Sequence, residues 1–408
     1  MIVRRLINRI RKFITNTIFI IVFMANRIVY NRCSVDDNLI VFYSIPSFSD
    51  NPRALYRRML SRDDCHQYRF VWLIDENYNL DSRCVLDQTE FIVLKKSSHV
   101  GNTLKSMMAL SKAKYIFFDH INPIWRVKQK KNQKIINLWH GCGYKDTSKG
   151  KPEGKWFDFA LVPGQLFINA KIKAWNCERN QIIDIGYPRY DELMAGSSDA
   201  LSLLSSIKKE NSYFIMWMPT FRKTGNNEYT EESIIQKYDF PLFSSTSEMI
   251  ELDKYCVANG IVLCIKRHPF QRKYLCEDVK FRNICFIDQA TLEKNNSSLY
   301  ELLHYADALI SDYSSVSVDY LLLNRPIAYT LDDYESYHKT RGFVFENPLQ
   351  YMPGNHLYNL SDLYCFLKQI MNGEDLYAVA RSSMISSMHN TTKNYCDRII
   401  EYFGLNRR

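Results

Sequence analysis

The sequence lacks the cysteine patterns that hold small secreted or zinc-bound domains together. Its 11 cysteines are an odd number, and no two of them form a C-x-x-C pair. Disulfide frameworks and zinc ribbons need paired or regularly spaced cysteines, so we expect neither. Scattered thiols of this kind are typical of a reducing compartment, the cytosol. No carboxylate cluster that would demand a divalent metal is present, and we expect no metal and no cofactor.

Long hydrophobic runs, low-complexity tracts, internal repeats and Gly-Ser linkers are also missing. The apolar run near the amino terminus, Phe13 to Ala25, is short for a membrane-spanning helix, which needs roughly 20 residues. It is not followed by the small-residue cleavage site of a signal peptide. A cleaved leader and an ordinary spanning helix are therefore both disfavoured.

Basic side chains flank this apolar run. Five of them precede it between Arg4 and Lys12, and Arg27 and Arg32 follow it. Residues 1–33 therefore predict a basic amphipathic helix lying on an anionic membrane surface, with arginines at the headgroups. Two alternatives stay open: a helix packed on the protein's own domain, and a short signal anchor.

Length and charge bound the fold and its partners. At 408 residues, with 46% hydrophobic residues, the chain has material for two domains, each with its own core. Lys+Arg 53 against Asp+Glu 44 gives a formal net charge of +9. This excess suits a nucleic acid, an anionic membrane or a phosphate-rich substrate, and charge alone does not choose among them.

From Asn38 onward, short apolar runs alternate with helix-length segments. Leu39 to Tyr43 predicts a strand, a helix opens around Pro52, and Tyr68 to Ile74 predicts a second strand. Strands separated by helices indicate parallel βαβ units, so the predicted class is α/β. Further strands are expected at residues 90–94, 115–118, 135–139, 213–218, 261–265, 284–287, 308–310 and 327–330.

A polar Gly-Ser-Ser-Asp stretch beginning at Gly196, followed by a short polar helix, is the best candidate for a boundary between two α/β halves. The predicted divisions are residues 1–33, the membrane-associating segment; 34–195, the first Rossmann-like domain; 196–210, the linker; 211–375, the second Rossmann-like domain; and 376–408, a carboxyl-terminal helix.

Residues 306–345 predict a strand, a polar turn, a helix and a second strand. The turn runs from Ser311 through Asp312 to Ser314 and Ser315, either of which can cap the helix. The first N–H groups of that helix have no partners within it, and they and the helix dipole suit a phosphate. Ordinary capping without a ligand is the alternative.

A histidine follows the predicted strand 135–139, in the stretch His140, Gly141, Cys142, Gly143. Carboxyl ends of parallel strands face the crevice in which such sheets bind ligands. The glycines would let a substrate approach the backbone, and His140 could accept a proton from an attacking hydroxyl. The alternative is a structural histidine bonded to a loop carbonyl.

Basic residues follow three other predicted strands. Arg189, in the turn Gly-Tyr-Pro-Arg, is either a phosphate ligand or part of an ion pair between domains. Arg222 follows the strand 213–218. Arg267 and His268, preceded by Lys266, suit a nucleotide diphosphate, the alternative being a solvated basic loop.

Together these motifs carry a resemblance that spans residues 39–403. Trp-His-Gly, Gly-Tyr-Pro-Arg, Pro-Thr-Phe-Arg, His-Pro and Ser-Asp-Tyr-Ser-Ser occur in this order, as in the CDP-glycerol glycerophosphotransferase family, the teichoic-acid primases and polymerases of bacteria. The chain departs from the family at Asn355, where a second proline is usual, and before Asn394, where Asp-Gly-Asn-Ser is usual. The resemblance implies a GT-B arrangement, two Rossmann-like domains facing each other across a cleft.

The resemblance also implies a reaction and its residues. An acceptor hydroxyl would attack the β-phosphate of a CDP-linked polyol and release CMP, at a site that holds no divalent metal. The implied catalytic residues are His140 and His268. The implied donor-binding residues are Arg222, Arg267, Ser311, Asp312, Ser314, Ser315, Asp319 and Arg341. The implied acceptor-side or supporting residues are Gly141, Lys145 and Arg189.

The implied substrates are CDP-glycerol or CDP-ribitol and a lipid-linked glycan of a teichoic acid or capsule, with glycerol phosphate favoured. The implied place is the cytoplasmic face of the bacterial plasma membrane, as a peripheral protein, and no nucleic acid is expected. One alternative is a GT-B glycosyltransferase that uses a nucleotide sugar and releases a nucleoside diphosphate. The other is a non-catalytic basic protein that binds membranes or nucleic acids.

Overall fold

The computed structural model describes residues 28, 31–78, 88–94, 104–120, 123, 130–148, 153–208, 212–220, 240–267 and 275–406. Most of the predicted amphipathic segment 1–33 lies outside these residues, as do Arg222 and His268. Among the helices that the structure describes, none combines the length and the apolar character needed to cross a membrane.

The first domain is built on a seven-stranded, all-parallel sheet with the strand order β3-β2-β1-β4-β5-β6-β7. Its central strand β1 pairs with β2 and β4, so that Val41 lies opposite both Val71 and Ile116. These apolar runs are buried on both faces, as parallel sheets require. The strands are β1 (Asp36–Tyr43), β2 (Arg69–Asp75), β3 (Thr89–Leu94), β4 (Ala113–Phe118), β5 (Lys134–Asn137), β6 (Phe159–Leu161) and β7 (Ile182–Ile183).

The second domain repeats this plan with a six-stranded, all-parallel sheet in the order β10-β9-β8-β11-β12-β13. Its central strands β8 and β11 are adjacent, and Leu309 lies opposite Met216. The strands are β8 (Tyr213–Trp217), β9 (Ile261–Lys266), β10 (Ile284–Ile287), β11 (Ala308–Ser311), β12 (Ile327–Thr330) and β13 (Asn355–Leu357).

Helices cover both sheets, and side-chain caps mark where several of them begin. Ser245 with Glu248, and Ser298 with Glu301, form capping boxes that satisfy the first free N–H groups of α7 and α9. The helices are α2 (Asp50–Leu60), α3 (Leu104–Lys112), α4 (Ile168–Trp175), α5 (Arg189–Ala195), α6 (Ser198–Ile207), α7 (Thr246–Ala258), α8 (Gln289–Lys294), α9 (Leu299–Leu303), α10 (Ser315–Tyr320), α11 (Tyr334–Thr340), α12 (Leu360–Met371), α13 (Ala378–Met388) and α14 (Tyr395–Tyr402).

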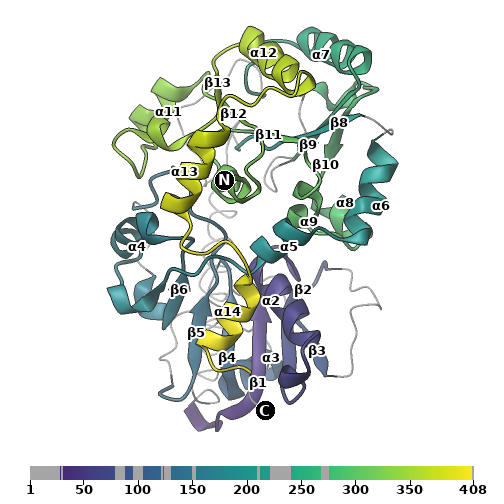
Figure 1. The fold of residues 1–408 in the computed structure, drawn as a ribbon. Coiled ribbons are helices and arrows are strands. Elements are labelled where there is room, and N and C mark those ends of the chain that lie inside the picture. Colours follow the sequence, from purple (N-terminus) through teal and green to yellow (C-terminus); the bar gives the residue numbers. More distant parts are fainter. Residues whose placement is uncertain are drawn as a thin grey trace, which may run out of the picture.

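The end of the chain returns to the first domain (Figure 1). Within residues 376–408, for which one helix was predicted, the structure has two helices. α13 packs on residues 165–167 of the first domain and 321–323 of the second, and α14 packs against α2 of the first. Arg58 makes two hydrogen bonds to Asp397, and the Tyr115 hydroxyl donates to the Phe403 carbonyl at 3.0 Å. The chain therefore crosses between the domains twice, once at the predicted linker 196–210, which contains α6, and once before α14.

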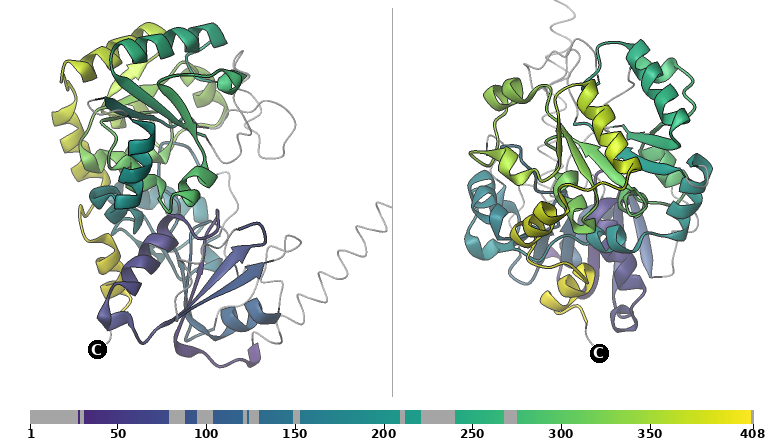
Figure 2. Two further views of the ribbon diagram at one scale, coloured as in Figure 1. Left: turned by 90° about the vertical axis from the view of Figure 1, so that its right-hand side faces the viewer. Right: turned by 45° about the horizontal axis from the view of Figure 1, so that its top comes forward.

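A cleft separates the two sheets, and the left view of Figure 2 shows one domain above the other. In each sheet the strand order reverses direction once, between β1 and β4 in the first and between β8 and β11 in the second. Open α/β sheets bind ligands just beyond such a switch point. The predicted GT-B arrangement of two Rossmann-like domains is confirmed, and its two switch points lie at the cleft.

Candidate active site

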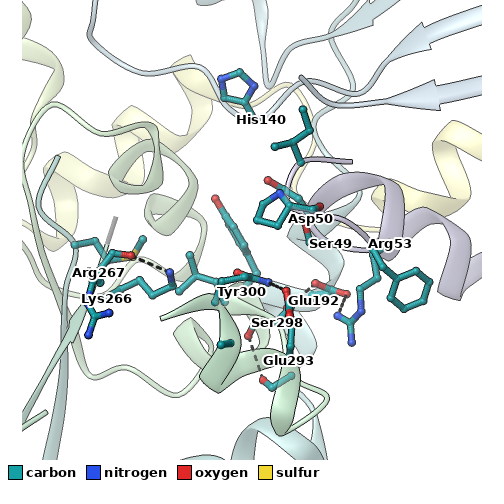
Figure 3. Close-up of a pocket in the computed structure, with 18 of the residues that line it drawn as sticks. Ser49, Asp50, Arg53, His140, Glu192, Lys266, Arg267, Glu293, Ser298 and Tyr300 are labelled. Atoms are coloured by element: carbon teal, nitrogen blue, oxygen red, sulfur yellow. Dashed lines mark hydrogen bonds and ion pairs between the residues drawn. The ribbon is translucent and has the colours of Figure 1, made fainter. Parts of the chain in front are cut away.

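A cavity of about 720 Å³ lies between the two domains (Figure 3). The loops after β1, β4, β5, β8 and β9 line it, together with residues of α8 and the approach to α9. In Figure 3, Lys266 and Arg267 lie on one wall, Asp50 and Glu192 on the other, and His140 at the end between them. The second domain thus contributes the cations Lys266 and Arg267 to one wall, and the first contributes the carboxylates Asp50 and Glu192, with Arg53, to the other.

His140 follows β5 and lines the cavity, as predicted. Its ring nitrogen Nδ1 lies 3.2 Å from the carbonyl oxygen of Asp119, which can only accept a hydrogen bond. The proton of the neutral ring is therefore on Nδ1, and Nε2 is left as a base. Burial, together with the charge of His120, holds the pKa of His140 well below its ordinary value, so the ring is neutral at pH 7.

The loop that carries His140 is braced on several sides. Trp139 has a left-handed backbone with φ 55°, and its carbonyl accepts a hydrogen bond from the side-chain amide of Asn51 at 2.5 Å. The Trp139 indole donates to the Gly141 carbonyl at 2.6 Å. On its other side the indole ring faces the buried Lys171 ammonium, 4.4 Å from the ring centroid. The position of His140 is therefore determined by its neighbours.

The glycines after His140 allow the two domains to approach each other. A Cβ on Gly141, whose φ is +124°, would lie 2.5 Å from the Ser315 hydroxyl oxygen, and one on Gly143 would lie 2.9 Å from the Ser315 backbone nitrogen. Sequence reasoning assigned this space to substrate. In the structure the first turn of α10 occupies it, which brings Ser315 against the His140 loop.

The turn after β11 meets the turn after β8 at the second switch point. Asp312 accepts hydrogen bonds from the Thr220 backbone N–H at 2.7 Å, from the Thr220 hydroxyl and from the Ser314 N–H at 3.2 Å. The Ser311 hydroxyl donates to the Met218 carbonyl at 2.9 Å. Ser311 and Asp312 are buried and hold the two turns together, while Ser314 lines the cavity and caps α10.

The cationic wall differs in detail from the sequence prediction. The Arg267 guanidinium lines the cavity but is held by Glu277 at 2.8 Å and Asp288 at 3.4 Å. Lys266 is only 7% exposed and donates to the Arg267 carbonyl at 3.0 Å. Burial lowers the pKa of Lys266 to about 8, so the ammonium is still protonated in most molecules at pH 7. Lys266, which the sequence analysis named only as the residue before Arg267 and His268, also lines the cavity.

Arg189 is a domain-interface residue, one of the two roles left open by the sequence. Its guanidinium contacts Asp50 at 2.8 Å and Asp319, in α10 of the second domain, at 2.6 Å. Asp319 also accepts hydrogen bonds from the hydroxyls of Tyr190 and, at 2.5 Å, Tyr300. Asp319 is fully buried in this network and is not among the residues lining the cavity.

A second interdomain contact runs beside the cavity. Lys145 lines the cavity, and its segment pairs with the loop that begins at Arg341: the Asp146 N–H donates to the Gly342 carbonyl at 3.1 Å, and the Val344 N–H donates to the Tyr144 carbonyl at 2.7 Å. Arg341 itself is not among the lining residues. The structure thus brings His140, Lys145, Arg267 and Ser314 to one cavity, but not Arg341.

Motif reasoning missed several residues of the cavity wall. Asp119 and His120 follow β4 as His140 follows β5, so the rule that found one histidine could have found the other. Glu192 lines the opposite wall, with its carboxylate 3.5 Å from Arg53 and bonded to the Ser298 hydroxyl at 2.7 Å. Burial raises the pKa of Glu192 to about 7, against the attraction of Arg53. No local sequence pattern marks such a residue.

Within the described ranges, no group of three or more His, Cys, Asp or Glu residues is arranged to hold a metal ion.

Comparison with known proteins agrees with the resemblance seen in the motifs. The chain is 26% identical over 329 residues to the teichoic acid ribitol-phosphate polymerase TarL of Staphylococcus aureus, covering 76% of this chain and 52% of that one. It is 25% identical to the teichoic acid glycerol-phosphate transferase of Staphylococcus aureus, covering 92% and 93%. The chain thus spans about half the length of TarL but nearly the whole of the smaller transferase.

Solved structures share the fold. A structure of the wall teichoic acid polymerase TagF superposes with a TM-score of 0.71 at 19% identity, over 97% of both chains. The family model for CDP-glycerol:poly(glycerophosphate) glycerophosphotransferases matches residues 24–402, nearly the whole chain. The protein belongs to the CDP-glycerol:poly(glycerophosphate) glycerophosphotransferase family.

Proposed function

We propose that the protein transfers a polyol phosphate from a CDP-activated polyol to a hydroxyl group of a growing cell-surface glycan. The acceptor oxygen forms a bond to the β-phosphorus, the bond from that phosphorus to the bridging oxygen breaks, and CMP leaves. The proton of the acceptor hydroxyl goes to Nε2 of His140. The observation that carries the proposal is the cavity at both switch points, with a neutral histidine at one end and a buried lysine on one wall.

Each wall has a separate task in this account. Lys266 neutralises charge on the diphosphate. Ser314, on the capped turn of α10, lines the same cavity and contacts the diphosphate in this proposal. Asp50 and Glu192, on the opposite wall, are suited to accept hydrogen bonds from the hydroxyls of a polyol. His268 and Arg222 keep their predicted roles beside the diphosphate, and both lie outside the described residues. The reaction is then mainly positioning and charge neutralisation.

The family supports the proposed acceptor and place of action. Relatives that match 92% and 76% of the chain are a teichoic acid glycerol-phosphate transferase and a teichoic acid ribitol-phosphate primase, which supports a teichoic acid or a related phosphate-containing capsule as the product. A lipid-linked acceptor would place the protein at the cytoplasmic face of the plasma membrane. The basic, apolar residues 1–33 supply the matching surface for anionic lipids.

The experiment that tests this function is a product assay with donor and acceptor varied separately. Purified protein is incubated with CDP-glycerol or CDP-ribitol, and in a separate arm with a nucleotide sugar, with and without a lipid-linked disaccharide acceptor, and the released nucleotide is identified. We expect acceptor-dependent CMP from one of the two donors. A nucleoside diphosphate released from a nucleotide sugar, with neither CDP-polyol consumed, would contradict the proposal and favour a glycosyltransferase.

A further inference from the structure

The loops after β4 and β5 place a second histidine against His140. The two strands are adjacent and parallel, and Phe118 at the end of β4 lies opposite Asn137 at the end of β5. His120 and His140 therefore leave the sheet side by side. Their ring centroids are 4.1 Å apart and their planes differ by 11°, so the rings are stacked face to face, and both line the cavity.

A single buried residue, Asp119, contacts both rings. Its carboxylate oxygen Oδ1 lies 2.9 Å from His120 Nδ1, and its backbone carbonyl lies 3.2 Å from His140 Nδ1. The same Oδ1 accepts a hydrogen bond from the Ile45 N–H at 3.2 Å. Because the Asp119 side chain is fully buried, it is not free to turn toward solvent, and its charge acts at close range on His120.

Stacking at this distance makes the two protonation states depend on each other. Two positive rings 4.1 Å apart repel strongly in a buried site, so one proton excludes the other. Burial lowers the pKa of His120, but the nearby Asp119 carboxylate outweighs burial and leaves that pKa above its ordinary value. Burial first, and then the charge of His120, lower the pKa of His140. The added proton is therefore held by His120.

Other charged groups around the pair also affect the protonation of the two rings. Asp50, from the start of α2, supports the proton on His120. Lys171 from α4 and Arg189 from α5 are cationic and oppose a proton on His140. Arg189 also opposes the proton on His120, but there the nearby Asp119 is the stronger influence. Asp50 thus favours a charged His120, while Lys171 and Arg189 favour a neutral His140.

We propose that the Asp119–His120 pair is a positioning element that keeps His140 neutral and presents its Nε2 as the base. The inference rests on the proposed function for its catalytic meaning, but the pairing itself is a property of the protein without substrate. His120 acts through His140, because it holds the one added proton that the two stacked rings can carry. The site then has an unprotonated base near neutral pH. Burial raises the pKa of Asp119 itself to about 6, so below that pH the pair loses the carboxylate that holds the proton on His120.

Two substitutions separate charge from packing. His120→Phe keeps a buried aromatic ring beside His140 and removes the charge, and Asp119→Asn keeps both rings and removes the carboxylate that holds the proton on His120. The pKa of His140 is read by an NMR titration of protein labelled only at histidine, without substrate, with His140→Gln used to assign the signal. We expect that pKa to rise by about one unit or more in both variants.

The same variants predict a change in the pH profile of turnover. A base works only when it is unprotonated, so a higher His140 pKa moves the acid limb of kcat/KM to higher pH. Activity is then lost near pH 6 and retained near pH 8, which a purely structural defect would not do. His66→Phe is the matched control, because His66 is exposed and outside the cavity, and it should change neither the titration nor the profile.

The outcomes distinguish the pair from the function. An unmoved His140 pKa in His120→Phe and Asp119→Asn overturns the inference, whatever the activity. A rise in both variants supports it even if no CDP-polyol is consumed, in which case only the proposed function fails. If His120→Phe does not fold, the His140 pKa in Asp119→Asn and His120→Gln tests the inference instead. Lower activity at every pH, with the acid limb of the profile unmoved, also overturns the inference.

Discussion

At the residue scale, the glycine after His140 lets the His140 loop pack closely against α10. Gly141 has a φ of +124°, and a Cβ there would lie 2.5 Å from the Ser315 hydroxyl oxygen and 2.9 Å from the Arg189 guanidinium. An added methyl group must therefore push the His140 loop away from α10, besides straining the backbone. The position of His140 therefore depends on the close contact of Gly141 with Ser315 and Arg189 at the interface between the domains.

This predicts a large effect of Gly141→Ala. We expect a loss of about 2–3 kcal/mol in the free energy of unfolding from backbone strain and the clash, and a fall in kcat/KM because His140 shifts. Gly260→Ala is the control, because Gly260 also has a positive φ, +63°, but has no atom within 4 Å of the added Cβ. It should cost only about 1 kcal/mol and leave kcat/KM unchanged. Wild-type kinetics in Gly141→Ala would contradict this account.

At the scale of elements, α5 of the first domain and α10 of the second are joined by one buried ion pair. Arg189 begins α5 and Asp319 lies in α10, and their side chains are 3% and 0% exposed. Two tyrosine hydroxyls complete the hydrogen bonds of Asp319. Removing one charge leaves its partner buried and incompletely paired, which is far more costly than breaking a surface pair.

We therefore expect Asp319→Asn to lower the free energy of unfolding by about 3 kcal/mol or more, measured by denaturant titration. The matched control is Glu251→Gln, which breaks the Glu251–Lys254 pair at 2.7 Å on the exposed face of α7, where the side chains are 64% and 66% exposed. That change should cost less than about 1 kcal/mol. Equal costs for the two variants would show that the buried pair does not hold the domains together.

The strands were largely predictable from the sequence, but the long-range contacts between elements were not. Apolar runs such as Leu39 to Tyr43 and Ile261 to Ile265 identify strands because a parallel strand is buried on both faces. The contact of Arg189 with Asp319 joins residues 130 positions apart, and that of Tyr115 with Phe403 joins residues 288 apart. No local periodicity encodes such pairs, so the interface and the return of α14 became visible only in the structure.

The candidate site was predictable to the same degree. His140 and Ser314 were identified because each follows a strand at its carboxyl end, and both line the cavity. Asp119 and His120 satisfy the same rule but lie in no motif, and they were passed over. Asp319 belongs to a motif but faces the interface, because the direction of a side chain on a short helix depends on how that helix packs.

At the scale of the whole molecule, the groups that hold the diphosphate and the general base come from different domains. The second domain contributes Lys266 and the capped turn at Ser314, and the first contributes His140. If the domains divide the work in this way, a change on one side should affect donor binding and a change on the other should affect turnover. The division is the central claim, because it follows from the cavity between the two sheets.

The most direct test is to measure donor affinity and CMP release for the same CDP-polyol in His140→Gln and Lys266→Gln. We expect His140→Gln to bind the donor within about twofold of the wild-type Kd but to release CMP at least about 100-fold more slowly, the range for loss of a general base. Lys266→Gln should raise the donor Kd about tenfold. CMP release at the wild-type rate by His140→Gln would contradict the account.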